Sequence, residues 1–226
     1  MNFNLKSQDA IDYLKSIQDE FVDLIITDPP YESLEKHRKV GTTTRLRHSK
    51  GSSNDWFDIF PNSRFEELFT ECFRILKPNR HFYLFCDQET AFAAKPIAEA
   101  AGFKFWKPLI WDKKKIGMGY HYRARYEFIL FFEKGKLKLN NLGTSDIIEC
   151  PRIIKGYPTE KPSFVSEVLI KQSSKEDYLV VDPFMGSGSV GEAAIKLNRN
   201  FIGNDLKQAM IPIARDRLIA SGGTEL

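Results

Sequence analysis

The stretch Leu179-Val180-Val181-Asp182-Pro183-Phe184-Met185-Gly186-Ser187-Gly188 decides the fold. Its apolar residues predict a buried strand, and its glycines predict a tight turn into a helix over 190–197. Asp205 follows the next short strand, 201–203. A glycine turn between strand and helix lets a ligand approach the backbone, and an acid after the next strand can accept both ribose hydroxyls. The stretch indicates a nucleoside-binding turn, and a purely structural glycine turn is the alternative.

Strands and helices alternate along the rest of the chain. Apolar runs predict strands over 20–27, 81–86, 105–111, 126–132 and 178–181, and helical periodicity predicts helices over 63–76, 88–101, 161–171 and 206–219. No regular element is predicted within 134–156. The alternation predicts a single domain over residues 1–226, of the α/β class, with a doubly wound and mostly parallel sheet.

A second turn carries the chemistry. The strand 20–27 ends at Asp28-Pro29-Pro30-Tyr31, where the prolines force the chain to turn. The Asp28 carboxylate and the Pro29 carbonyl are neighbouring acceptors that match the two protons of an amino group, and Tyr31 can stack on a base. Two acceptors on an aryl amine favour a tetrahedral nitrogen whose lone pair can attack a methyl group. The turn indicates a catalytic site for an exocyclic amine; a proline turn with a capping aspartate is the plainer alternative.

The composition is that of a globular protein. The 226 residues are 42% hydrophobic and 28% charged, with a net charge of +3 that is compatible with nucleic acid binding without establishing it. Apolar runs such as 22–26 are too short for a membrane span, and the N-terminus lacks a signal core, so a cytoplasmic protein is predicted. Scattered cysteines argue against a disulfide framework: Cys72, Cys86 and Cys150. No metal site is predicted, and the histidines are assigned to the surface or to DNA contacts: His37, His48, His81 and His121.

Together, these motifs resemble those of the S-adenosylmethionine-dependent DNA methyltransferases that methylate amino groups. The turn at 28–31 resembles their catalytic motif, and 182–188 resembles their cofactor loop. The catalytic motif comes first, which resembles the circularly permuted beta group. Further segments resemble family motifs: 74–79, 157–162 with Tyr157 in place of His, and 201–205. The resemblance implies a Rossmann-like methyltransferase fold with this permuted motif order.

The resemblance also implies roles for individual residues. The catalytic residues implied are Asp28, Pro29, Pro30 and Tyr31. The residues implied to bind S-adenosylmethionine are Asp9, Lys161, Asp182, Phe184, Met185, Gly186, Ser187, Gly188 and Asp205. Among them, Asp9 stands where the family places an acid on the adenine of the cofactor, and Asp205 is the acid for the ribose.

The same resemblance implies the reaction. Aspartate at the first catalytic position is typical of adenine 6-amino methylation, whereas serine is typical of cytosine 4-amino methylation. The implied activity is site-specific transfer of a methyl group from S-adenosylmethionine to the 6-amino group of a flipped adenine in DNA. A cytosine 4-amino methyltransferase and a non-catalytic DNA-binding module are the alternatives, and a homodimer and a partner restriction endonuclease stay open.

Positive charge is concentrated in one segment. Residues 104–138 hold ten Lys or Arg and three acids, a pattern that suits DNA phosphates or, alternatively, a solvated face. The polar stretch 32–55 is predicted to be a mobile loop that faces DNA, and 135–156 is a short candidate segment for target recognition. The candidate DNA-binding residues are Arg45, Arg47, Lys113, Lys114, Lys115, Arg123 and Arg125.

Overall fold

The computed structural model describes residues 1–32, 58–117, 121–154 and 160–226. Its strands are β1 (Asn2–Lys6), β2 (Val22–Thr27), β3 (Leu76–Cys86), β4 (Lys104–Asp112), β5 (Tyr126–Lys134), β6 (Ile147–Glu149), β7 (Leu179–Asp182), β8 (Asn200–Asn204) and β9 (Thr224–Glu225). Its helices are α1 (Ala10–Lys15), the short 3-10 helix η2 (Asn62–Arg64), α3 (Phe65–Ile75), α4 (Gln88–Ala100), α5 (Ser163–Ser173), α6 (Ser189–Lys196) and α7 (Met210–Ala220). None of these helices is long and apolar enough to cross a membrane.

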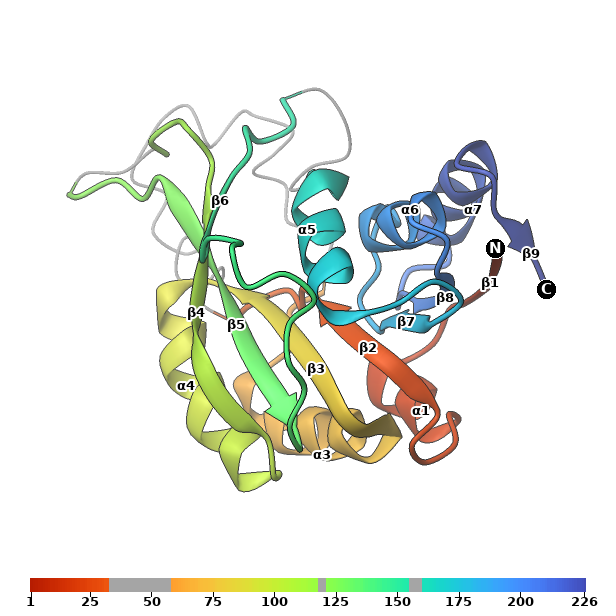
Figure 1. Cartoon of the computed structure of the whole chain (residues 1–226), viewed down its shortest axis with the longest axis horizontal. Helices are drawn as coiled ribbons and strands as arrows, with labels where there is room; N and C mark the ends of the chain where they lie inside the picture. The colour runs from red at the N-terminus through yellow and green to blue at the C-terminus, as the bar shows by residue number, and fades with distance from the viewer. Residues whose placement is uncertain (33–57, 118–120, 155–159) are drawn as a thin grey trace.

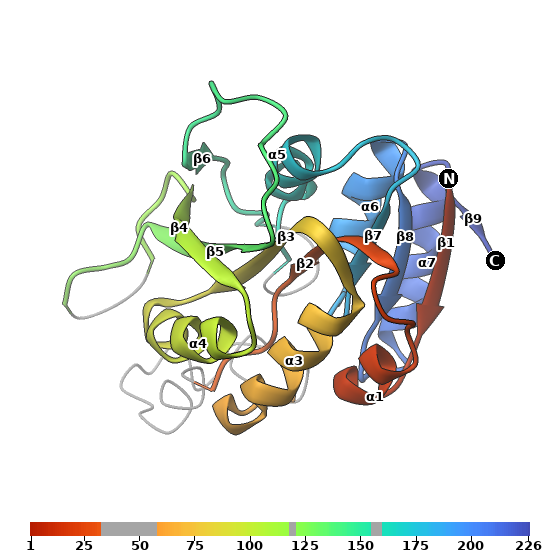
Figure 2. The same ribbon diagram turned by 60° about the horizontal axis from the view of Figure 1, so that its bottom comes forward.

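The described strands form one sheet in the order β6-β4-β5-β3-β2-β7-β8-β1-β9. Only β5 runs against its neighbours, and the other pairs are parallel. Helices α1, α3 and α4 cover one face, and α5, α6 and α7 cover the other (Figures 1 and 2). The predicted α/β class and the mostly parallel, doubly wound sheet are confirmed.

Each buried strand supplies both halves of the core, because side chains alternate across a sheet. Along β2, Leu24 and Ile26 pack on the side of α5, α6 and α7. Ile25 packs on the opposite side, with α1, α3 and α4. Every residue of β2 is buried, which explains why its sequence is mostly apolar, with Asp23 as the one charged residue.

The sheet reverses its winding where β2 lies beside β7. From β2 the chain continues to β3 on one side, and from β7 it continues to β8 on the other. Residues 24–25 pair with 180–181, and hydrogen bonds join the two strands beyond both ends of this register. At one end the buried Asp23 carboxylate accepts from the first backbone N–H of β7 at 3.1 Å; at the other, Thr27 Oγ1 donates to Asp182 Oδ1 at 2.8 Å. Ligands of such sheets bind at the carboxyl ends of the strands at this reversal.

Three sequence-based expectations need correction. The segment 134–156 is not wholly irregular, because β6 lies within it and pairs with β4 at the edge of the sheet. A strand of three residues is too short to show a periodicity in the sequence. The strand predicted over 81–86 begins at Leu76. His81 is not a surface or DNA-contacting residue; it is fully buried, with Ser173 Oγ 2.7 Å from Nδ1 and the Leu137 carbonyl 3.1 Å from Nε2. Of the predicted loop 32–55, all but the first residue lies outside the described residues.

Candidate active site

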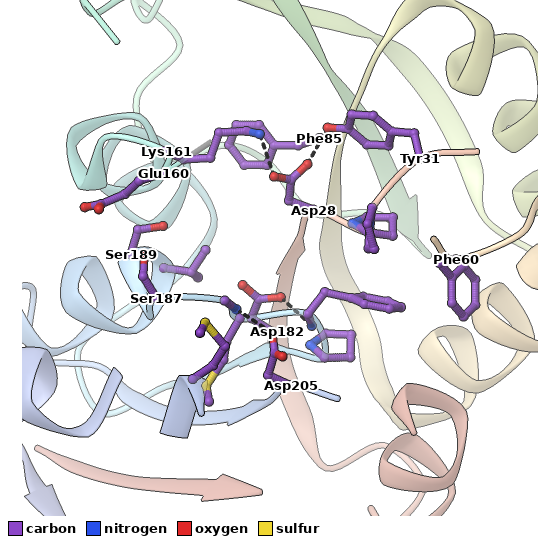
Figure 3. A pocket seen from close by; sticks show the side chains of 18 of the residues that line it. Asp28, Tyr31, Phe60, Phe85, Glu160, Lys161, Asp182, Ser187, Ser189 and Asp205 are labelled. Atoms are coloured by element: carbon purple, nitrogen blue, oxygen red, sulfur yellow. Dashed lines mark hydrogen bonds and ion pairs between the residues drawn. The ribbon is translucent and has the colours of Figure 1, made fainter. Parts of the chain in front are cut away.

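The two sequence motifs meet at one cavity of about 620 Å³. The turn 28–31 follows β2 and the loop 182–188 follows the adjacent strand β7, so both project from the same edge of the sheet. Figure 3 shows Asp28 and Tyr31 on one side of the cavity and Asp182 and Asp205 on another. The volume lies within the range of cavities that hold cofactors and small ligands.

Two glycines of the loop serve different purposes. Gly186 has φ +50°, and apart from its chain neighbours no atom of the described residues lies within 4 Å of the position that a Cβ would take, so this side of its backbone is open to a ligand. Gly188 has φ +82° at the N-cap of α6, and a Cβ there would lie 3.0 Å from Ala214 Cβ. Left-handed backbone of this kind favours glycine. The loop therefore presents main-chain atoms to the cavity while α6 packs closely against α7.

The acid after β8 supports the same loop. Asp205 Oδ2 accepts from the Gly186 N–H at 3.0 Å, and Oδ1 accepts from the Lys207 N–H at 2.8 Å. Burial raises the pKa of Asp205 above its ordinary value, although these two N–H groups act in the opposite direction. Asp205 lines the cavity, so its carboxylate is placed to accept hydrogen bonds from a ligand beside the loop.

Asp182 joins the two motifs and has an unusual proton affinity. Its Oδ1 accepts from Thr27 Oγ1 and from the Phe184 N–H at 3.0 Å. Burial raises its pKa from 3.8 to about 7, despite these two hydrogen bonds. The pKa of this carboxyl therefore lies near neutral pH.

A pH effect on stability follows. The folded protein holds the Asp182 proton up to about pH 7, whereas an unfolded chain loses it near 3.8, so this group makes the free energy of unfolding fall as pH rises between these values. Asp182→Asn keeps an oxygen acceptor and cannot ionise. We expect it to flatten the fall between the two measured pH values by about 3 kcal/mol, since one pKa unit corresponds to about 1.4 kcal/mol. Urea unfolding of both proteins at pH 4.5 and pH 7.5 measures this, and equal slopes would contradict it.

The Asp28 carboxylate lies in a cluster of charges. Lys161 Nζ is 2.5 Å from Asp28 Oδ2 and 3.2 Å from Glu127 Oε2, and the Tyr31 hydroxyl donates to Asp28 Oδ1. Lys113 pairs with Glu127 Oε1. Burial and the nearby Glu127 raise the pKa of Asp28, although Lys161 and the Tyr31 hydroxyl act in the opposite direction. Burial also opposes ionisation of Glu127, but Lys161 and Lys113 outweigh it and hold the pKa of Glu127 below its usual value.

Two residues that the resemblance assigns to the cofactor, Lys161 and Asp9, lie apart from the loop 182–188 and have charged partners of their own. Lys161 lines the cavity at the catalytic turn, where it pairs with Asp28. Asp9 lines the cavity too, but it caps α1 by accepting from the Ile11 and Asp12 N–H groups, and it forms a bidentate pair with Arg64 at 2.7 and 2.8 Å. Any contact between Asp9 and a cofactor would share these oxygens with Arg64.

The candidate DNA-binding cations divide into two groups. Lys113 and Arg125 are paired, the first with Glu127 and the second with both oxygens of Asp112 at 2.7 and 2.6 Å. Lys114 is 2.5 Å from Glu149. Lys115 and Arg123 are exposed, and neither forms an ion pair with a described residue. Arg45 and Arg47 lie outside the described residues. The charge excess of 104–138 is therefore partly neutralised within the protein, which weakens its attraction for phosphates.

Sequence reasoning missed several residues of the cavity wall. In the sequence Glu127 is only one of three acids among the cations of 104–138, yet in the structure it bridges Lys113 and Lys161. Phe85 and Trp111, at the ends of β3 and β4, also line the cavity. Their position at the carboxyl end of a strand was the available signal, but the order of the strands had to be known before it could be used.

Two buried polar atoms of the wall have hydrogen-bonding capacity left for a ligand. Within the described residues, Ser166 Oγ has no hydrogen-bond partner and Glu127 Oε2 has only the ion pair with Lys161, and both residues line the cavity. Buried polar groups are normally satisfied, so these atoms, with the open backbone at Gly186 and the carboxylate of Asp205, fit a polar ligand with hydroxyl and amino groups. No cluster of three or more metal-ligating side chains occurs in the ranges that the structure describes.

Comparisons with known proteins agree with this geometry. A family model described as DNA methylase, of the N6/N4 type, matches residues 22–151 and 139–216. The type II methyltransferase M.HhaII of Haemophilus parahaemolyticus is 30% identical over 205 residues, which cover 87% of this chain and 88% of that protein.

Solved structures resemble the whole chain. The complex of M1.HpyAVI with S-adenosylmethionine has a TM-score of 0.69 and 25% identity, covering 96% of this chain and 99% of that one. The PvuII DNA methyltransferase, described as cytosine-N4-specific, has a TM-score of 0.76 over 96% of this chain and 86% of its own, at 17% identity, so that likeness concerns the fold. Since the family model covers most of the chain, including both turns of the cavity, this protein belongs to the N6/N4 DNA methylase family.

Proposed function

We propose that this DNA methyltransferase transfers a methyl group from S-adenosylmethionine to the 6-amino group of an adenine that is flipped out of DNA. One observation carries the proposal: the Asp28 turn and the glycine loop 182–188 line the same cavity, at the ends of adjacent strands. A methyl donor held by the loop and an amine held by the turn would then meet there. Holding two reactants in line is the main source of rate in such a transfer.

The residues divide the work between cofactor and base. S-adenosylmethionine supplies a methyl group on a positively charged sulfur. The loop of Asp182, Phe184, Met185, Gly186, Ser187 and Gly188 would hold it, with Asp205 accepting from the ribose hydroxyls. The Asp28 carboxylate and the Pro29 carbonyl would accept the two amine protons. Tyr31, whose hydroxyl donates to Asp28, would present its ring to the base and keep the carboxylate oriented.

The choice of adenine rests on Asp28. In the family that the motifs resemble, aspartate at this position is typical of adenine methylation. The order of motifs along the chain, with the Asp28 turn before the glycine loop, supports membership in the permuted beta group. Cytosine is the second candidate, because PvuII, which has the same fold, is described as cytosine-N4-specific.

Nucleoside analysis of the reaction product tests the choice of base. Unmodified genomic DNA is incubated with the protein and S-adenosylmethionine carrying a labelled methyl group, digested to nucleosides and separated by mass spectrometry. We expect the label in 6-methyladenine. Label in 4-methylcytosine would show that the target base is cytosine, although the protein would still be a DNA methyltransferase. Unlabelled DNA would contradict methyl transfer. Mapping the modified positions in the same DNA gives the recognition sequence.

Other parts of the proposal concern DNA recognition and biological context. We assign DNA contacts to Lys115 and Arg123, to the stretch 32–55 with Arg45 and Arg47, and to the segment 135–156. Relatives such as M.HhaII are named type II methyltransferases, which supports a role in a restriction-modification pair with a cognate endonuclease.

A further inference from the structure

We propose that Lys161 is an exchangeable counter-ion of Asp28, which neutralises the catalytic carboxylate before the base arrives and moves onto Glu127 when the target amine takes its place. The inference rests on the proposed function, because it assumes that Asp28 receives an amino group. It gives Lys161 a positioning role at the catalytic turn, in place of the cofactor contact implied by the sequence.

The first step concerns the oxygens of Asp28. Oδ2 is 2.5 Å from Lys161 Nζ, and Oδ1 accepts from the Tyr31 hydroxyl (Figure 3). Each carboxylate oxygen therefore already has a charged or hydrogen-bonding neighbour. A target amine that binds Asp28 has to compete with one of these neighbours.

Lys161 is the neighbour better suited to leave. Tyr31 is buried, and its backbone pairs with Phe60, whose N–H donates to the Pro30 carbonyl at 2.9 Å. The ammonium of Lys161 is a compact charge on a flexible stem with three donors, so it can exchange one acceptor for another by side-chain rotation. An arriving amine would therefore displace Lys161 and leave Tyr31 in place.

The second step concerns where the ammonium goes. Glu127 Oε2 is buried and lies 3.2 Å from Lys161 Nζ, and it has no other partner within the described residues. Lys113 occupies only the other oxygen, Oε1. The ammonium thus already lies between two carboxylates, and a small movement toward Glu127 would shorten the second ion pair as the first one opens.

The third step is the balance of charge. Asp28, Glu127, Lys161 and Lys113 together carry two negative and two positive charges. Moving Lys161 from one carboxylate to the other changes neither this sum nor any protonation state. Its side chain is only 11% exposed, and an unpaired charge in such surroundings is costly, so the exchange needs an acceptor at each end. Glu127 provides the second acceptor and leaves Asp28 free to polarise the amine.

The experiment compares Glu127→Gln, Lys161→Met and the double variant. Glu127→Gln removes the charge of the second acceptor, so Lys161 stays on Asp28. We expect KM for DNA to rise at least about tenfold, which corresponds to about 1.4 kcal/mol, while the Kd for S-adenosylhomocysteine changes less than twofold. At pH 8, the double variant with Lys161→Met should have a KM for DNA at least about fivefold lower than that of Glu127→Gln alone. In Lys161→Met alone, Asp28 and Glu127 face each other without this cation, so the acid limb of the pH–rate profile should move to higher pH.

A second ion pair on a neighbouring helix provides the control. Lys171 and Glu167 are 3.7 Å apart on α5, and neither lines the cavity. Lys171→Met and Glu167→Gln should leave KM within twofold. Circular dichroism of each variant checks folding. Fluorescence of 2-aminopurine at the mapped target base reports base capture without methyl transfer, and Glu127→Gln should weaken it.

The outcomes separate this inference from the function on which it rests. If the wild-type protein transfers no methyl group to DNA, the proposed function and the exchange both fail. If the wild type is active and Glu127→Gln leaves both KM and 2-aminopurine capture unchanged, only the exchange is overturned. Losses that multiply in the double variant would also overturn it, because they would show two independent structural roles.

Discussion

Asp28→Ala is expected to lower the rate of methyl transfer by about a thousandfold, while the affinity for the cofactor stays within about twofold. The substitution removes the carboxylate that would accept an amine proton, and single preorganised groups of this kind are worth about a hundredfold to a thousandfold. It also removes the partner of the Tyr31 hydroxyl, a contact that would orient the ring beside the base in the proposed arrangement. Single-turnover transfer to DNA and calorimetry with S-adenosylhomocysteine measure the two quantities.

The matched control is Asp216→Ala, which truncates an exposed acid of α7 that does not line the cavity. It should retain wild-type rate and affinity. Near-normal transfer by Asp28→Ala would remove Asp28 from the mechanism. Loss of cofactor binding together with loss of transfer would show instead that the turn shapes the whole cavity.

Asp205→Ala is expected to have the largest effect on cofactor affinity, raising the Kd for S-adenosylmethionine by about a hundredfold. Hydrogen bonds to a charged group contribute about 1.5–3 kcal/mol each, and the ribose hydroxyls would lose this acceptor. The loop would also lose the contact between Asp205 and the Gly186 N–H, which holds the backbone that faces the ligand. Calorimetry at pH 7.5 measures the affinity.

The same variant should recover much of its rate at saturating cofactor, because Asp205 does not touch the amine in the proposed arrangement. Asp216→Ala again serves as the control. An unchanged Kd for Asp205→Ala would contradict the ribose assignment, and a rate that stays low at saturation would place Asp205 in the transfer step as well.

The sequence predicts the central part of the fold well. The buried strands β2 and β7 are continuous apolar runs, and the turns that follow them are marked by prolines and glycines, so both motifs could be placed at strand ends. The edge of the sheet was harder to predict. β6 has three residues and only one buried side chain, and β1 alternates over five residues, so neither carries enough periodicity to stand out.

Partners of the charged residues could not be predicted from the sequence. Lys113 and Arg125 were assigned to DNA because they lie in a basic segment, but antiparallel pairing brings Asp112 opposite Tyr126 and turns these cations toward Glu127 and Asp112. The sequence analysis assigns His81 to the surface or to a DNA contact, but its position in β3 buries it. Such pairings depend on strand register, which only the folded chain supplies.

The hydrogen bonds that Asp23 and Thr27 make to β7 have a consequence for alignment. Successive residues along a strand are about 3.3 Å apart, so a slip of one residue between β2 and β7 would displace the amine from the methyl group by more than the length of two covalent bonds. Asp23 lies at the opposite end of β2 from the proposed reaction site, yet its hydrogen bond to β7 helps to fix the register of the two strands. The alignment of the proposed site at one edge of the sheet therefore depends on a contact at the other edge.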